Sequence, residues 1–325
     1  MEKILIEDAI EEMLFNDEAR GLAVNTIEKH KKFLGMFKAF LTEKMINYID
    51  EVEPKHIKSF LLVKFREGLA ESYINTFLRS IRALFNYCEN EGYISFKENP
   101  VKNVSWMKEE KKVIRTFNDE EIKKIFNFCK NQTKVSVKRL DRKGAGSLTK
   151  FVRERDYLLV ILLTDTGLRI SEALNLKMVD IGNGEIHVKR AKGKKGRVLY
   201  ISAILQKQII KYERAKKVYF SWKDFDVKDY LILNKNGNKY ARDMSERDIK
   251  RICDKCDIRT DIQRTPHAFR HYFAQSLVRS ETNIYVIQRL LGHSSIKTTE
   301  IYLNSLNYQE VLRIGKENSP VSRLR

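Results

Sequence analysis

Two arginines, two histidines and a tyrosine in the second half of the chain have the chemistry needed to bind and attack a phosphate. His267 and Arg270 follow Thr265-Pro266, a pair typical of the N-cap and first residue of a helix. Residues three apart share a helical face, so both side chains would lie at its positive end, where anions bind. Arginine also presents a fork of N–H groups that matches two phosphate oxygens. Alone, however, such a pair is usually an ordinary surface pair.

Arg169 lies in Thr-Gly-Leu-Arg-Ile-Ser-Glu at 166–172, a glycine turn that leads into a predicted helix. Its neighbours Leu168 and Ile170 are apolar, and an arginine is costly to bury among apolar residues without an anion. The pattern therefore favours an anion-binding arginine. The alternative is a structural ion pair with Glu172, three residues further on.

His293 and Tyr302 lie nine residues apart near the end of the sequence. Gly292 is suited to end the preceding helix in a left-handed turn, which would leave His293 in a loop with its ring nitrogens free. Tyr302 is expected on a short helix that begins near Ser295. A tyrosine in such a place normally belongs to the core or to an interface.

A basic turn, Lys192-Gly193-Lys194-Lys195-Gly196, adds a lysine to this set. Together these side chains supply what phosphodiester transfer without a metal requires. Two arginines neutralise the pentacoordinate phosphorus, an acid protonates the leaving oxygen, and a phenol attacks and stores the bond energy covalently.

The elements that must position these residues are mainly helical. The first hundred residues show helical periodicity, and their aromatic side chains are expected in the core. The apolar segment 157–163 predicts a buried helix, and helices continue from about 205 onward, interrupted by a strand-like segment at 230–233. β-rich runs at 185–191 and 197–201 flank the basic turn and predict a hairpin. The predicted fold is mainly α with a small antiparallel β-sheet.

The sequence divides into a helical domain at 1–104, a polar linker at 105–115 and an α+β domain at 116–325. Asn118 and Glu121 form a capping-box pattern at the start of the second domain.

A basic insert at 130–155 holds nine basic residues and two acidic ones. One interpretation is a solvated surface loop. The other is an extension that grips phosphates, because neutralising backbone charge releases counterions and increases affinity.

The charge of the chain points to a polyanionic partner. Lys and Arg number 62 against 43 acidic residues, a formal net charge of +19. Residues 1–104 carry 15 basic and 17 acidic residues, so the remaining 47 basic and 26 acidic residues account for all of the excess. Long-range attraction of a nucleic acid would therefore come mainly from residues 105–325.

Other functional classes receive little support. The four cysteines do not form a disulfide framework, and Cys253 and Cys256 form a lone CxxC that reads better as a helical face than as half of a zinc site. The longest apolar run, 158–163, is too short to span a membrane, and the acidic opening segment is not a secretory signal. A reduced, cytoplasmic setting fits best.

Three segments resemble the signatures of the tyrosine recombinase (phage integrase) family, with the closest likeness to its Xer members. They are 166–172, His-Ala-Phe-Arg-His at 267–271, and Leu-Gly-His-Ser-Ser-Ile-Lys-Thr-Thr-Glu-Ile-Tyr at 291–302. Residues 21–27 also resemble the start of the family's core-binding, SAM-like domain. The resemblance covers nearly the whole chain.

The resemblance implies a role for each candidate residue. Arg169 and Arg270 would grip the scissile phosphate, and His293 would bind a non-bridging oxygen. His267 would help to position the phosphate and handle the proton of the nucleophile. Tyr302 would form a 3′-phosphotyrosyl link.

The general acid toward the leaving 5′-oxygen would be Lys192, which heads the Lys-Gly-x-Lys pattern at the end of the β-run. Lys194 and Lys195 lie in the same turn and remain alternatives.

The resemblance also implies a C-shaped clamp around double-stranded DNA with inverted half-sites. Two protomers would bind each site, and four would exchange strands through a Holliday junction, with no cofactor, ATP or metal. No room for an arm-binding domain precedes residue 20, which favours a compact recombinase that binds core sites only. The tail after residue 303 would dock on a neighbouring subunit or pack on its own chain. Accessory proteins and a nucleoid-associated location are compatible with this picture.

Two rival functions keep part of this chemistry. A type IB topoisomerase-like enzyme would relax DNA without exchanging partners, and a catalytically silent accessory factor would bind DNA only. The complete residue set argues against the second. A basic RNA-binding protein is a more distant alternative, because no aromatic RNA motif is recognisable.

Overall fold

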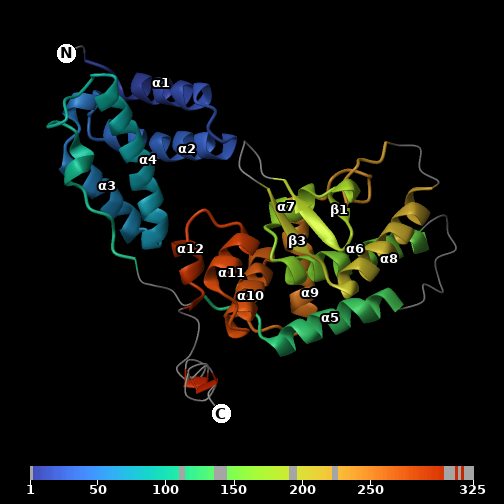
Figure 1. Cartoon of the computed structure of the whole chain (residues 1–325). Helices are drawn as coiled ribbons and strands as arrows, with labels where there is room; N and C mark the ends of the chain where they lie inside the picture. Colours follow the sequence, from blue (N-terminus) through green and yellow to red (C-terminus); the bar gives the residue numbers. More distant parts are fainter. Residues whose placement is uncertain are drawn as a thin grey trace. The chain divides into compact units, whose positions relative to one another are not determined.

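The computed structural model describes residues 3–109, 114–134, 145–189, 196–221 and 226–303, together with the short pieces 312–313 and 316–317. The chain divides into two compact units, Met1–Lys111 and Lys112–Arg325. The helices and strands of each unit are shown in Figure 1. None of the described helices is long and apolar enough to cross a membrane.

The first unit is a bundle of α1 (Ile6–Ala19), α2 (Val24–Thr42), α3 (Pro54–Arg66) and α4 (Glu71–Asn90), with the short 3₁₀ turns η1 (Ile49–Glu51) and η2 (Pro100–Asn103). Helix α4 packs against the other three, drawn in blue and teal in Figure 1. Phe37, Phe60 and Phe77 are almost fully buried, and their rings contact one another or neighbouring rings. The prediction that these aromatic side chains form a core is confirmed.

The first half of the predicted linker is attached to this bundle. The Asn75 side chain exchanges two hydrogen bonds with the backbone of Met107, at 2.9 and 3.0 Å. The Arg82 guanidinium lies over the Trp106 ring, 4.4 Å from its centre. Residues 105–109 therefore pack on the helical bundle. The boundaries of the linker remain a prediction.

The second unit surrounds one buried helix, α6 (Ala145–Thr166). Its other helices are α5 (Asp119–Lys134), α7 (Ile170–Asn175), α8 (Ala203–Phe220), α9 (Arg242–Lys255), α10 (Pro266–Arg279), α11 (Ile284–Leu291) and α12 (Lys297–Glu300), with the 3₁₀ turn η3 (Met178–Asp180). Helix α6 packs against α5, α8, α9 and α10. Residues 158–163 are buried on every face, which explains their unbroken apolar run and confirms the predicted buried helix.

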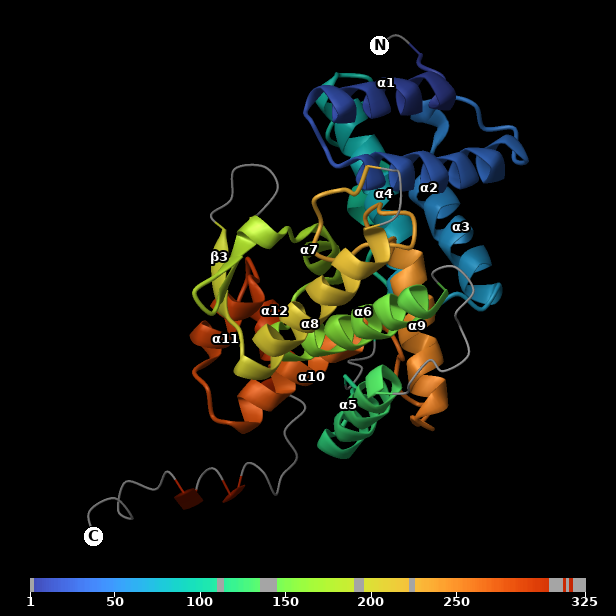
Figure 2. The ribbon, with the colours of Figure 1, turned by 90° about the vertical axis from the view of Figure 1, so that its right-hand side faces the viewer.

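A three-stranded antiparallel sheet lies beside these helices. The strands β1 (Ile181–Gly182), β2 (Glu185–Val188) and β3 (Arg197–Tyr200) are ordered β1-β2-β3. Ile186 pairs with Leu199, and both are buried. Figure 2 shows β3 next to α11, and the two elements are in contact. The predicted hairpin is confirmed, although β2 ends at Val188, and residues 190–195 lie outside the described part of the chain.

The strand-like segment at 230–233 is not a strand. Leu231, Ile232 and Leu233 are all fully buried, so the segment is apolar because it belongs to the core. Its only described β-pairing is an isolated bridge between Leu233 and Lys239.

The loop interpretation of the basic insert at 130–155 is wrong for its described residues. Residues 130–134 are the end of α5, and residues 145–155 are the first turns of α6. Arg155 is buried, and its Nη2 donates to Asp156 Oδ1 and Asp248 Oδ2, each at 2.8 Å. Arg155 is therefore part of a buried ion-pair cluster in the second unit. Residues 135–144 lie outside the described part of the chain.

Candidate active site

Arg270 is the buried centre of the candidate site, with 1% of its surface exposed. It lies in the first turns of α10, as the Thr-Pro start predicts, although Thr265 makes no side-chain capping bond. Its guanidinium donates to the carbonyl oxygens of Gly167 at 2.7 Å and Leu291 at 2.8 Å. Burial and the charge of Arg169 lower the pKa of Arg270 to about 10, which still leaves it charged at neutral pH. Two carbonyl dipoles therefore fix a buried positive charge.

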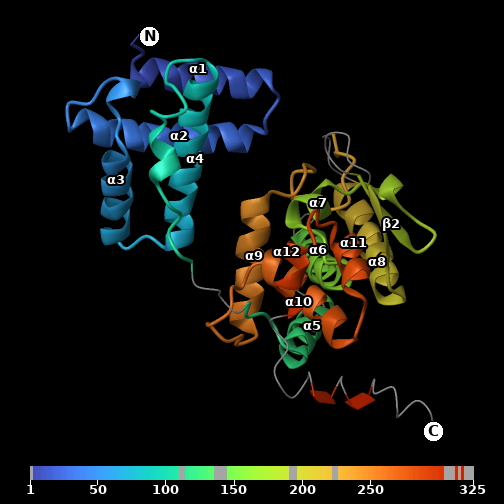
Figure 3. The same cartoon turned by 60° about the vertical axis from the view of Figure 1, so that its left-hand side comes forward.

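Both of these carbonyls lie at left-handed glycine turns. Gly167 follows α6 with φ 59°, and Gly292 ends α11 with φ 64°, directly after Leu291. At Gly167 a Cβ atom would also lie 2.3 Å from Cδ1 of Phe273, so no other residue fits without displacing that ring. The two glycine turns predicted from the sequence are confirmed. Figure 3 shows α10, α11 and α12 gathered beside α6.

His293 follows Gly292 as predicted, but its ring nitrogens are not free. Arg270 Nη2 lies 2.9 Å from His293 Nε2, and His293 Nδ1 lies 2.9 Å from Thr299 Oγ1. An arginine can only donate, so Nε2 accepts and Nδ1 carries the hydrogen of the neutral ring. Burial and the positive charge of Arg270 lower the pKa of His293 to about 4. This histidine is therefore neutral at physiological pH.

Tyr302 follows α12 instead of lying within the predicted short helix, and it is 2% exposed. Its phenol oxygen lies 3.0 Å from His271 Nδ1. Its ring is nearly parallel to that of His293, at 7° and 6.4 Å between centres. Burial raises the pKa of Tyr302, and the charges of Arg270 and Arg169 oppose that rise. The phenol thus lies within the electrostatic field of both arginines.

His267 lies one turn before His271 on α10. The two rings meet edge to face, with their centres 4.5 Å apart. Burial, followed by the charges of Arg270 and Arg169, lowers the pKa of His267. The Tyr302 hydroxyl contacts His271, a residue of the motif at 267–271 for which no role was predicted.

Arg169 is the N-cap of α7, and its side chain is 40% exposed. Glu172 accepts hydrogen bonds from the backbone N–H of Arg169 at 2.9 Å and from its guanidinium at 3.1 Å. The structural pair that the sequence offered as an alternative is therefore present. Arg169 nevertheless stays partly exposed at the site. Its charge lowers the pKa of Arg270 and opposes the rise in the pKa of Tyr302.

A second arginine, Arg197 at the start of β3, shares the same carboxylate. It donates to both oxygens of Glu172, at 3.0 and 2.8 Å, and to the carbonyl of Leu290 at 2.8 Å. Burial favours the neutral acid, but Arg197 and Arg169 outweigh it and lower the pKa of Glu172 to about 2. Glu172 thus connects α7 to β3, and Arg197 connects β3 to α11. Arg197 was not among the predicted site residues, because only the pairing of β2 with β3 brings it to this site.

The predicted general acid, Lys192, and its alternatives Lys194 and Lys195 lie outside the described residues. Val188 and Arg197, which close the described hairpin, pair directly with each other. Because Arg197 belongs to the Glu172 network, the described end of this strand pair lies at the candidate site.

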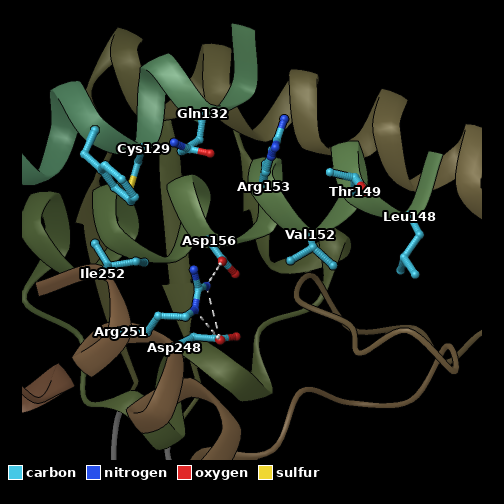
Figure 4. Close-up of a pocket in the computed structure, with 11 residues that line it drawn as sticks. Cys129, Gln132, Leu148, Thr149, Val152, Arg153, Asp156, Asp248, Arg251 and Ile252 are labelled. Atoms are coloured by element: carbon cyan, nitrogen blue, oxygen red, sulfur yellow. Dashed lines mark hydrogen bonds and ion pairs between the residues drawn. The ribbon is translucent and has the colours of Figure 1, made fainter. Parts of the chain in front are cut away.

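Two of the pockets among the described residues of the second unit differ in their relation to the candidate site. One of about 490 Å³ is lined by Arg197, Leu290 and His293 among others, so it opens onto the candidate site. The other, of about 480 Å³, lies among α5, α6 and α9 and contains none of the predicted site residues (Figure 4). There Arg251 bridges Asp156 and Asp248, so the charges of this pocket are already paired.

The CxxC pair at the end of α9 shows no sign of a metal site. Cys253 is fully buried, and burial raises its pKa to about 12. Among the residues that the structure describes, no group of three or more His, Cys, Asp and Glu side chains is placed to hold a metal ion.

Comparison with known protein families agrees with this arrangement. Residues 115–309 match the profile described as Phage integrase family, and residues 12–92 match Phage integrase, N-terminal SAM-like domain. The chain belongs to the phage integrase family. The resemblance seen in the sequence motifs is thereby confirmed.

Several curated phage integrase family members align along most of the chain. Tyrosine recombinase XerC of Thermodesulfovibrio yellowstonii is 27% identical over 279 residues, which cover 84% of each chain. Tyrosine recombinase XerD of Staphylococcus aureus is 27% identical over 300 residues, which cover 91% of this chain and 94% of the relative.

Solved structures of family members share the fold. XerH recombinase in a post-cleavage complex with a palindromic difH substrate has a TM-score of 0.72 at 23% identity, covering 94% of this chain and 82% of that one. A lambda integrase dimer bound to a COC′ core site has a TM-score of 0.69 at 16% identity, covering 93% and 78%. The predicted fold class, mainly helical with a small antiparallel sheet, is confirmed.

Proposed function

We propose that this protein is a site-specific DNA recombinase that cleaves and rejoins DNA through Tyr302. The observation that carries the proposal is the continuous series of contacts from Arg270 through His293 and Tyr302 to His271. Family membership and relatives named tyrosine recombinases support it.

The scissile phosphate would bind between Arg270 and Arg169. Arginine has five N–H donors, and three of those of Arg270 are used by the described partners Gly167, Leu291 and His293. The remaining two can bind a non-bridging oxygen. Arg169, held by Glu172 but 40% exposed, can bind the other. Two positive charges would then neutralise the additional negative charge of the pentacoordinate state.

The covalent step would transfer the phosphate to the phenol. The Tyr302 oxygen attacks phosphorus, the bond from phosphorus to the 5′-oxygen breaks, and a 3′-phosphotyrosyl link forms. The leaving 5′-oxygen takes a proton from the acid, for which Lys192 is proposed, with Lys194 and Lys195 as alternatives. The reverse attack by a 5′-hydroxyl of another strand rejoins the DNA. The energy of the diester is retained, so the reaction needs neither ATP nor a metal.

His293 would act in two stages. In the free protein its Nε2 accepts from Arg270, so that nitrogen cannot donate to a phosphate oxygen. Binding of phosphate by Arg270 would release Nε2, and the ring could then donate after a change of tautomer or protonation. Thr299 Oγ1 can accept from or donate to Nδ1, and it is therefore compatible with either tautomer.

The proposed partner is double-stranded DNA with inverted half-sites, bound by two protomers per site and four in the synapse. Structures of a relative bound to DNA, in one case to a palindromic substrate, support a DNA partner. The excess of basic residues after residue 104 supports the same polyanion. We further propose a cytoplasmic, nucleoid-associated location and a role either in chromosome resolution or in integration of a mobile element, with accessory proteins as additional partners.

The decisive experiment traps the covalent intermediate. Nicked suicide substrates from the neighbourhood of the gene should form a protein–DNA adduct, because the short released strand cannot rejoin. The adduct should vanish in Tyr302→Phe and persist in Tyr285→Phe, which alters an exposed tyrosine on α11. An adduct that survives in Tyr302→Phe contradicts the proposal. Cleavage at one sequence followed by pairing of two sites would distinguish recombination from simple DNA relaxation.

A second experiment identifies the acid. Lys192, Lys194 and Lys195 are replaced singly by alanine, and each variant is given DNA with a 5′-bridging phosphorothiolate. A thiolate leaves without protonation, so the variant that lacks the acid should recover cleavage on this substrate alone. Recovery in none of the three contradicts the assignment of the acid to this turn.

A further inference from the structure

We infer that His271, rather than His267, is the base that takes the proton from the Tyr302 hydroxyl. The inference rests on the proposed function and concerns the same site. His271 Nδ1 lies 3.0 Å from the phenol oxygen, within the range required for direct proton transfer. His267 contacts the ring of His271, with 4.5 Å between ring centres.

His271 is in the uncharged state that a proton acceptor requires, although its lowered pKa makes it a weaker base than a free histidine. It lies among His267 and Arg270 on α10, and burial together with these two neighbours lowers the pKa of His271 to about 4. The ring is therefore neutral, and one nitrogen carries a lone pair. In the tautomer that carries its hydrogen on Nε2, Nδ1 accepts a hydrogen bond from the Tyr302 hydroxyl, and this is the form that the proposed step uses.

The other histidine next to the nucleophile is less suited. Both nitrogens of His293 are occupied, Nε2 by Arg270 and Nδ1 by Thr299. Its ring lies parallel to that of Tyr302, at 6.4 Å between centres, so its nitrogens are not directed at the phenol by this geometry. Of these two histidines, His271 is thus the one whose ring nitrogen lies within hydrogen-bond distance of the reacting oxygen.

The proton balance of the step is complete without another reagent. As the Tyr302 oxygen bonds to phosphorus, its hydrogen moves to His271 Nδ1, and the charged ring then has hydrogens on both nitrogens. The 5′-oxygen leaves with the proton of the acid. When a 5′-hydroxyl rejoins the strand, the acid is protonated again, and His271 returns its proton to the phenol oxygen. His267 keeps the role of binding the phosphate at the start of α10.

The test uses full-length protein and a suicide substrate in single-turnover cleavage. His271→Asn places an amide oxygen near the position of Nδ1, so it can accept the hydrogen bond but cannot take the proton. His271→Phe keeps a ring of similar volume without either function. Both variants should cleave about 10²–10⁴-fold more slowly than the unsubstituted protein. Tyr272→Phe, which removes a hydroxyl bonded to Asp119 on an exposed side of the same helix, should cleave at the normal rate.

A second measurement separates a base from a residue that only positions the phenol. Fluorinated tyrosine at position 302 has a lower phenol pKa and needs less help from a base. It should accelerate His271→Asn more than it accelerates the protein with His271. DNA-binding affinity and thermal unfolding of each variant show whether it is folded, and if His271→Phe is unfolded the comparison rests on His271→Asn.

Three results would overturn the inference. Cleavage by His271→Asn within about threefold of normal would show that acceptance of a hydrogen bond is sufficient. Faster cleavage by either variant would show that His271 restrains the nucleophile in the free protein. If fluorinated tyrosine accelerates cleavage by His271→Asn no more than cleavage by the protein with His271, then His271 only positions the phenol. Failure of the unsubstituted protein to form an adduct would instead contradict the proposed function itself.

Discussion

Replacement of Glu172 by glutamine should destabilise the second unit markedly. Glu172 and Arg197 have only 15% and 9% of their side chains exposed, and the carboxylate accepts four hydrogen bonds from Arg197 and Arg169. Glutamine keeps the size of the side chain but removes its charge. Its amide also turns one acceptor into a donor that faces a guanidinium. Breaking a buried pair in this way leaves the partner's charge uncompensated.

The magnitude follows from the pKa of Glu172, which falls from 4.5 to about 2 in the folded protein. Each pKa unit corresponds to about 1.4 kcal/mol, so the ionised carboxylate stabilises the fold by about 3 kcal/mol. Because the folded pKa is the lower one, this contribution is present above pH 4.5 and is lost as the pH falls toward about 2. Roughly half should be lost by about pH 3.

The assay is urea unfolding of the full chain at about pH 7, pH 5 and pH 3, followed by circular dichroism. Glu172→Gln should lower the free energy of unfolding by about 3 kcal/mol at neutral pH, and its difference from the unsubstituted protein should shrink at the lowest pH. Glu246→Gln, which breaks an exposed pair with Arg242, should change stability far less. A difference below about 1 kcal/mol at neutral pH, or one that is independent of pH, would refute this account of Glu172.

Three further substitutions test other parts of the site. Arg270→Lys should reduce cleavage by at least about 100-fold in single-turnover assays. The reason is that one ammonium nitrogen cannot replace a guanidinium that binds two carbonyl oxygens and a phosphate. Near-normal cleavage would contradict this prediction. Thr299→Val leaves the hydrogen on His293 Nδ1 without its acceptor. This variant should lower the free energy of unfolding by about 1–3 kcal/mol and slow cleavage. Unchanged stability and cleavage would exclude the tautomer of His293 with its hydrogen on Nδ1. Asn118→Ala removes the cap of α5 and should cost about 1 kcal/mol in thermal unfolding without altering cleavage, so a loss of activity would show that α5 has a role beyond stability.

The sequence predicted those parts of the fold that local chemistry determines. The capping box formed by Asn118 and Glu121 is present, with reciprocal hydrogen bonds of 2.8 Å. Gly292 ends its helix in the left-handed conformation, as glycine after a helix often does. The unbroken apolar run in α6 marked the helix that is buried on all sides.

Contacts between distant segments could not be predicted in the same way. Arg197 reaches Glu172 because β3 pairs with β2, and no local pattern distinguishes it from other basic residues near the turn. The choice between His267 and His271 depends on how α10 is rotated relative to Tyr302. The burial of Arg155 in the basic insert could not be predicted either, because its partner Asp248 is distant in the sequence. The roles of the site residues and the domain boundaries remain predictions.

The buried arginine of this site depends for its location on the main chain. Arg270 donates to two carbonyl oxygens, and each belongs to, or directly precedes, a glycine in the left-handed conformation, Gly167 or Gly292. Carbonyl groups are present whatever side chains surround them. Most side chains around Arg270 could therefore change during evolution without displacing its guanidinium, provided that Gly167 and Gly292 are conserved. Catalytic geometry of this kind tolerates sequence drift.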